Sequence, residues 1–140
     1  MKAELTALAE RFKAATGAES YSVIAPRDKV PPYTILEPVA PPDSVLDRRL
    51  SPSDPGVVLD VRVLSVGGSP DAAMNLARIG KADVSPDGAP TALTITGRHA
   101  EVAHVRFEAA YPDDSITLSG TNRHPVVVVE TYRVSSQPTA

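Results

Sequence analysis

Residues 67–70, Gly-Gly-Ser-Pro, have the composition of a ligand-binding turn. They follow an alternating apolar run and precede a helix-like run, and helix N-termini at such junctions often bind phosphate. The spacing matches neither G-x-x-x-x-G-K-[ST] nor G-x-G-x-x-G, the two common phosphate-binding loops. Ser69 is suited to cap the helix, Pro70 removes a free N–H, and Asp71 places a carboxylate where a ligand anion would bind. The sequence therefore predicts a structural joint whose helix end is satisfied by its own side chains.

Three histidines are the candidate metal ligands. His99 and His104 are five residues apart, so on a strand they point to opposite faces and make poor co-ligands. His124 with Asp113 and Asp114 would offer nitrogen and oxygen ligands. A small metal-dependent enzyme using His104, His124 and Asp113 is the remote alternative. We interpret these side chains as solvated loop residues, and we expect no metal and no cofactor.

Signatures of nucleophilic catalysis and of metal-dependent hydrolysis are missing from the sequence. It has no G-x-S-x-G serine, no H-E-x-x-H pair and no cysteine. We therefore predict that the protein is not an enzyme.

Two charged pairs are candidate contacts to a partner. Arg48 and Arg49 are either a solvated pair or a contact to an acidic partner. Asp113 and Asp114 are adjacent in a polar stretch, where carboxylates are solubilising or face a partner. We retain all four as candidate interface residues.

Composition limits the class of protein. The 140 residues suit one domain, and the formal net charge of −3 is too mild for a nucleic-acid binder with a basic face. No apolar run approaches the roughly 20 residues that cross a bilayer, and the N-terminal segment lacks the apolar core of a signal peptide. We expect synthesis in the cytoplasm and no membrane contact.

Hydrophobic periodicity predicts an α+β fold. Leu5, Leu8, Phe12 and Ala15 share one stripe of an N-terminal helix that ends at Gly17. A second helix is expected over residues 70–83. Strands are expected at residues 21–24, 33–37, 57–66, 93–96, 101–107 and 126–134, with long loops at about 39–55 and 110–124. This order favours a mixed, mainly antiparallel sheet with two helices packed on it, in a single domain over residues 1–140.

Alternation assigns faces within two of these strands. Val57, Leu59, Val61 and Val63 share one face, and polar side chains occupy the other. In the strand at 101–107, we expect Ala103, Val105 and Phe107 on one face. Val102, His104 and Arg106 are expected on the other.

The run of four valines at 126–129 indicates a strand that is buried on both faces. Helices of the same chain can cover it, or a second subunit can. Val126, Val128 and Tyr132 are therefore candidates for an interface or for the core beneath it.

Four segments in order carry a resemblance to a known family. They are the N-terminal helix with its short strand, PPYTILEPV, VVLDVRVLSVGGSPDAAMNLARIGKADV and PVVVVETYRVSSQP. Together they resemble the tail terminator proteins of long-tailed (siphovirus) phages, particularly those infecting actinobacteria. The sequence departs from the family in having valines where aromatics are frequent near the last strand. Its two long loops also differ from the family, so the contacts that the family makes through these loops cannot be assigned to this chain.

The resemblance implies a virion structural protein. Such proteins form a ring, typically a homohexamer, at the head-proximal end of the tail tube. The ring ends tube polymerisation and provides the joint to the head connector, and DNA passes through its lumen without specific binding. A closed ring needs a heterologous interface, and an acidic lumen would not retain DNA. We expect the loops at 39–55 and 110–124 to contact tube and connector. Another neck component, a head-closure or tail-completion protein, is the alternative.

Overall fold

Two α-helices and six strands make up the described part of the chain. The computed structural model describes residues 2–22, 30–39, 56–113 and 124–139. The elements are α1 (Lys2–Thr16), β1 (Glu19–Ser22), β2 (Tyr33–Val39), β3 (Val57–Gly67), α3 (Pro70–Val84), the 3-10 turn η1 (Pro86–Gly88), β4 (Thr91–Ile95), β5 (Arg98–Pro112) and β6 (Val126–Pro138).

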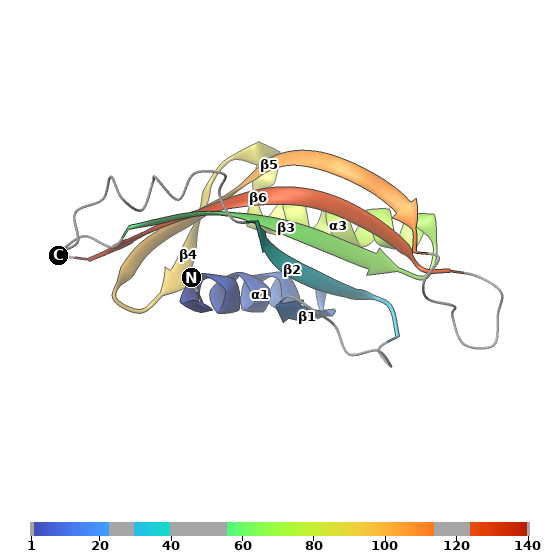
Figure 1. Cartoon of the computed structure of the whole chain (residues 1–140), viewed down its shortest axis with the longest axis horizontal. Helices are drawn as coiled ribbons and strands as arrows, with labels where there is room; N and C mark the ends of the chain where they lie inside the picture. Colours follow the sequence, from blue (N-terminus) through green and yellow to red (C-terminus); the bar gives the residue numbers. More distant parts are fainter. Residues whose placement is uncertain (1, 23–29, 40–55, 114–123, 140) are drawn as a thin grey trace.

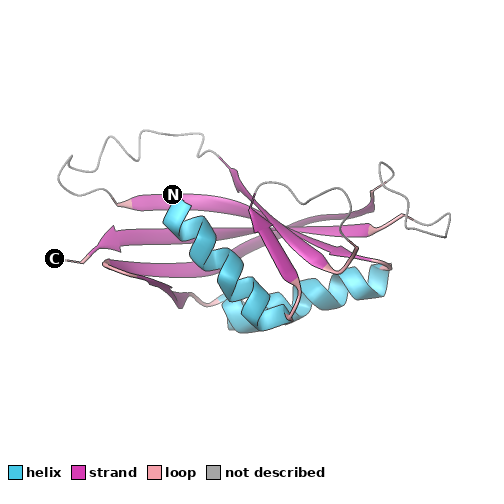
Figure 2. Ribbon diagram, turned by 90° about the horizontal axis from the view of Figure 1, so that it is seen from below, coloured by secondary structure: helices cyan, strands magenta, loops and turns pink. Residues whose placement is uncertain are grey.

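The strands form one sheet in the order β1-β2-β3-β6-β5-β4 (Figure 1). Strands β1 and β2 are parallel, and every other neighbouring pair is antiparallel. Both helices lie on the same face of this sheet (Figure 2). The predicted α+β class, with a mixed and mainly antiparallel sheet and two helices in a single domain, is confirmed.

The main core lies between the helices and the centre of the sheet. The predicted alternation in β3 is confirmed, because Leu59, Val61 and Val63 are buried on the helix-covered face. They are joined there by Leu8 of α1 and Val134 of β6. Each fully buried valine or leucine side chain stabilises the fold by about 1.5–3 kcal/mol relative to an exposed one.

Phe12 of α1 reaches the sheet across α3. Its ring lies edge-on to Tyr132 of β6, with centroids 5.2 Å apart and planes at 84°. Gly80 of α3 leaves the space for it, because a Cβ at residue 80 would lie 2.9 Å from Phe12 Cε1. The small residues of α3 therefore have two uses: Gly80 admits α1, while Ala73 and Ala77 pack against Val128 of the sheet.

The glycine turn is a structural joint, as predicted. The Ser69 side chain accepts a hydrogen bond from the backbone N–H of Ala72, and Pro70 is the first helical residue. Gly67 is required by close packing, because an added Cβ would lie 2.4 Å from the backbone N of Ala73. Gly17 also ends α1 as predicted, with a φ of +73° that glycine adopts readily.

Strands β2, β5 and β6 each run two or more residues past the C-terminal end that the sequence predicts. Residues 110–112, expected in a loop, continue β5 because they pair with residues 126–128 of β6. Strand β6 likewise runs to Pro138 because β3 and β5 pair with it on either side. Pro38 does not end β2. Strand β1 pairs only as far as Leu36, so Pro38 lies on an open stretch of edge where its missing N–H is tolerated.

The predicted faces of Arg106 and Phe107 are wrong because β5 is bulged. The register with β6 shifts between His104 and Arg106, which leaves Val105 as an extra residue. Arg106 then lies opposite Thr131 and Phe107 opposite Glu130. His104 and Phe107 therefore share the helix-covered face.

The run of four valines in β6 is covered on both faces, as predicted, with Val127, Val128 and Val129 buried and Val126 half-buried. Val126 and Val128 pack toward Ala73 and Ala77 on the helix-covered face. Val127 and Val129 belong to a second apolar cluster on the helix-free face, with Tyr33 and Val66 among its buried members.

Several predictions fall outside the described residues. The loop predicted at 39–55 does so except for Val39, as do residues 114–123 of the second loop and residues 23 and 24 of the first predicted strand. In the ranges that are described, no helix combines the length and apolar character needed to cross a membrane.

The contact between Phe12 and Gly80 can be tested by Gly80→Val. The new side chain would overlap the Phe12 ring, and overpacking of this kind costs about 1–3 kcal/mol. We expect the free energy of unfolding, measured by urea denaturation, to fall by that amount. Ala82→Val, at an exposed site on the same helix, is the control and should change stability by less than about 1 kcal/mol. Equal stability of the two variants would contradict the packing described.

Candidate functional site

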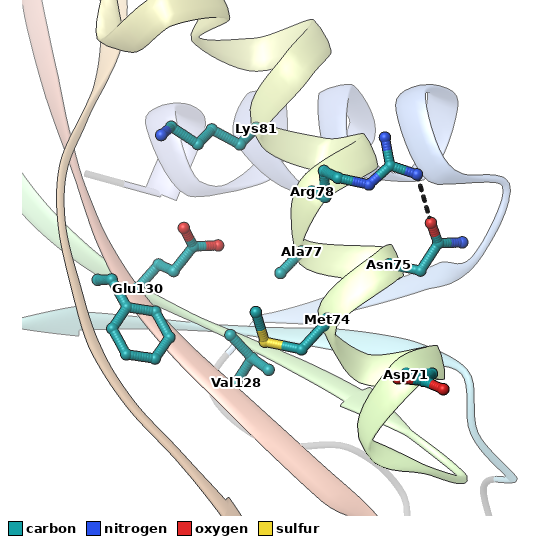
Figure 3. Close-up of a pocket in the computed structure, with 9 residues that line it drawn as sticks. Asp71, Met74, Asn75, Ala77, Arg78, Lys81, Val128 and Glu130 are labelled. Atoms are coloured by element: carbon teal, nitrogen blue, oxygen red, sulfur yellow. Dashed lines mark hydrogen bonds between the residues drawn. The ribbon is translucent and has the colours of Figure 1, made fainter.

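A groove between α3 and strands β5 and β6 is the candidate site. It has a volume of about 430 Å³ (Figure 3). We call it the α3–β5 groove, and it is lined by Asp71, Met74, Asn75, Ala77, Arg78, Lys81, Phe107, Val128 and Glu130. Met74 and Phe107 are 49% and 52% exposed, which is high for large apolar side chains. The groove thus has an apolar wall and a charged rim.

A buried hydrogen-bonded pair, His104 and Glu130, lies at the groove, where Glu130 is a lining residue. His104 Nε2 is 2.8 Å from Glu130 Oε2, and the two side chains are only 11% and 8% exposed. Burial raises the pKa of Glu130, while the nearby His104 and Lys81 act in the opposite direction. The His104 ring also lies edge-on to Tyr132, with centroids 5.1 Å apart.

No activated nucleophile lies beside the His104–Glu130 pair among the described residues. Tyr132, whose ring contacts His104, carries a hydroxyl group. Burial and the negative charge of Glu130 both raise the pKa of the Tyr132 hydroxyl far above its ordinary value, so it stays protonated. A buried phenol of that kind is a poor base and a poor nucleophile. We interpret His104 as the group that offsets the cost of burying Glu130.

The outer edge of β5 borders the groove and is largely open. Strand β4 pairs with β5 only as far as Val102, although β5 continues to Pro112. Ser85 Oγ accepts a hydrogen bond from the backbone N–H of His104 at 2.9 Å. Beyond that point, residues 105–112 have no strand on their outer side within the described part of the chain. Open strand edges are common sites of association between chains.

The helix-free face carries a row of ion pairs. Arg62 Nε lies 3.0 Å from Glu108 Oε2, and its NH1 lies 3.8 Å from Glu37 Oε2. Arg133 forms a two-point contact with Asp60, at 2.7 and 3.2 Å. Partial burial raises the pKa of Glu108, but the nearby Thr131 hydroxyl, the hydrogen bond from Arg62 and the positive charges of Arg62 and Arg106 outweigh this and hold the pKa below its ordinary value.

The residues predicted for an interface are scattered. Tyr132 and Val128 are fully buried in the core of the single chain. Of the two predicted roles, interface or core, both residues therefore have the core role. Val126 is partly buried against α3. Asp113 lies at the end of β5, where its backbone N–H donates to the Pro125 carbonyl. Arg48, Arg49 and Asp114 lie outside the described residues.

The residues of the metal-site alternative are not brought together. His104 is paired across the sheet with Tyr132, whereas Asp113 and His124 lie at the far end of the β5–β6 pair. Eight residues of β5, 105–112, separate His104 from Asp113, which corresponds to more than about 20 Å. Within the described ranges, no group of three or more ligating side chains could hold a metal ion.

Sequence reasoning did not identify the α3–β5 groove. Phe107 was assigned to the wrong face because the bulge at Val105 depends on pairing with a distant strand. Glu130 carried a usable signal, since a carboxylate that follows four buried valines in one strand needs a partner. That partner, His104, is 26 residues away in sequence.

Comparison with known proteins gives no assignment. No protein-family model matches the chain, and no curated protein was found to match it.

The His104–Glu130 pair predicts a pH-dependent effect of Glu130→Gln. Because the pKa of Glu130 is raised above its ordinary value of 4.5, the folded protein holds this proton more tightly than the unfolded chain. The resulting stability is present below about pH 4.5 and is lost as the pH rises through the raised pKa. We expect the free energy of unfolding of the wild type, relative to Glu130→Gln, to fall in chemical denaturation as the pH rises above about 4.5.

Glu108→Gln provides a comparison of opposite sign. The lowered pKa of Glu108 gives stability that is present above its ordinary pKa of 4.5 and is lost as the pH falls through the lowered value. Relative to Glu108→Gln, the wild type should therefore lose stability on acidification. If the stability differences for the two variants changed with pH in the same direction, the environment described for Glu130 or for Glu108 would be contradicted.

Proposed function

We propose that this protein is a structural subunit of a phage virion that forms a ring on the head-proximal end of the tail tube. The ring ends tube polymerisation and joins the tail to the head connector. The assembly role rests on an exposed contact surface, and the choice of assembly rests on the ordered resemblance of four segments.

The contact surface is the single observation that carries the assembly role. The α3–β5 groove exposes Met74 and Phe107 by about half, and the open edge of β5 runs beside it. An exposed apolar wall next to an open strand edge promotes association of chains. A subunit that is buried in an assembly accounts for both features.

The segments that resemble tail terminators make up one packed unit. They correspond to α1 with β1, to β2, to β3 with α3, and to β6. The strands among them are neighbours in the sheet, in the order β1-β2-β3-β6, and both helices pack on them. The β4–β5 hairpin carries none of the resemblance, and it supplies the open edge.

The helix-free face suits a surface past which DNA moves. Phosphate binding depends on uncompensated positive charge. The arginines on this face are each paired with a carboxylate: Arg62 with Glu108 and Glu37, Arg106 with Glu108, and Arg133 with Asp60. Compensated guanidinium groups do not retain phosphates strongly, so this face is compatible with a lumen and leaves the groove for contacts between subunits.

Light scattering tests the proposal directly. We expect the purified protein to form a closed species of several 14.7 kDa chains, either alone at high concentration or only on added tail tubes of the same phage. A protein that stays a single chain and does not bind tubes would contradict the proposal. Binding to the head connector without binding to tubes would instead support a head-closure or tail-completion protein.

A further inference from the structure

One cation on the rim of the α3–β5 groove, Arg78, has no carboxylate partner in the described ranges. Arg78 donates to the Asn75 side-chain oxygen, at 2.6 Å, whereas Lys81 lies close enough to Glu130 to favour its charged form (Figure 3). All other arginines in these ranges are paired with Asp or Glu, namely Arg11, Arg62, Arg98, Arg106 and Arg133. Asp71, at the start of α3, is likewise exposed and outside any ion pair between described residues.

The exposed face of α1 carries the opposite arrangement of charge. Lys2 and Glu10 are both exposed and form no ion pair within the described part of the chain. They border a shallow hollow of about 540 Å³ between α1 and β4, which is lined by Lys2, Ala3, Thr6, Ala7, Glu10, Thr94 and Ile95. Apart from the two charged residues, these side chains are small or of medium size, so the hollow has room for large side chains from another surface.

The spacing of charges matches between the two helices. Asp71 and Arg78 are seven residues apart, and Lys2 and Glu10 are eight apart, which correspond to about 10 and 12 Å along a helix. If α1 of one copy lies parallel to α3 of another, Lys2 meets Asp71 and Glu10 meets Arg78. Met74 and Phe107 then enter the hollow beside Ala3 and Ala7.

We propose that the α3–β5 groove binds the α1–β4 surface of a second copy of this chain. The inference rests on the proposed function and names the contact between neighbouring subunits of the ring. The two surfaces are different patches of the same protein, so the contact is heterologous and repeats around a closed ring. Its charged rim fixes the register of the two helices, and its apolar centre is removed from water.

A charge exchange tests this pairing. Arg78→Glu and Glu10→Arg each place like charges against one another in the contact. We expect each variant to raise the concentration at which half of the chains are assembled by at least about tenfold in dilute salt, as judged by light scattering. The double variant restores opposite charges and should return the midpoint to within about threefold of the wild type.

A matched control separates the pairing from net charge and from misfolding. Glu101→Arg makes the same charge change as Glu10→Arg at a site outside both surfaces, and it should not move the midpoint. The side chains of Arg78, Glu10 and Glu101 are all exposed, so urea denaturation should show native stability for each variant. Carbodiimide treatment of mixed labelled and unlabelled chains should link Lys2 to Asp71 or Lys81 to Glu10 between copies.

The outcomes distinguish this inference from the proposed function. If the wild type forms no ring, either alone or on tubes, both the proposed function and the contact between the α3–β5 groove and the α1–β4 surface are contradicted. If rings form and the single variants assemble normally, only the pairing is overturned. The same holds if the double variant does not recover, or if the groove variants keep the ring but lose the tail tube.

Discussion

The packing of Phe12 over Gly80 onto Tyr132 joins both helices to the centre of the sheet. Any side chain at residue 80 would occupy the space of the Phe12 ring, so the approach of α1 depends on one missing Cβ. Arg11 fixes the same end of the helix pair. Its guanidinium donates to the Asp83 side chain at 3.1 Å and to the carbonyls of Asp83 and Ala92. One turn of α1 thus orients α1, α3 and β4 together.

Tyr132 connects this packing to the α3–β5 groove. Its ring contacts Phe12 and also His104, which in turn bonds to Glu130 at the groove. A carboxylate in a strand of valines costs several kcal/mol unless a partner compensates it. His104 can compensate Glu130 only because the Tyr132 ring and the β5–β6 register hold the imidazole in place. The shape and charge of the groove at Glu130 are therefore consequences of the core.

The parts of the fold that could be predicted are those whose signals are local. The cap at Ser69, the helix end at Gly17 and the alternation in β3 each depend on a few adjacent residues, and all three are confirmed. The groove could not be predicted because its parts come from α3, β5 and β6. Phe107 faces it only because the bulge at Val105 shifts the register against β6. Alternation along the strand gives the opposite face, and no residue near Val105 signals the shift.

The same argument applies to the exposed charges of the two helices. The sequence shows Lys2, Glu10, Asp71 and Arg78 as ordinary polar residues of amphipathic helices. Once the inner faces are occupied by the core, these side chains remain at the surface. The other arginines of the described ranges are paired with carboxylates. Leaving them unpaired in water costs little, because an exposed ion pair contributes about 0–1 kcal/mol. These four charges contribute to specificity only when they face a second surface. There, like charges disfavour a wrong register and opposite charges favour one orientation. An apolar groove alone would bind many partners, and the charges on its rim are what restrict it to one.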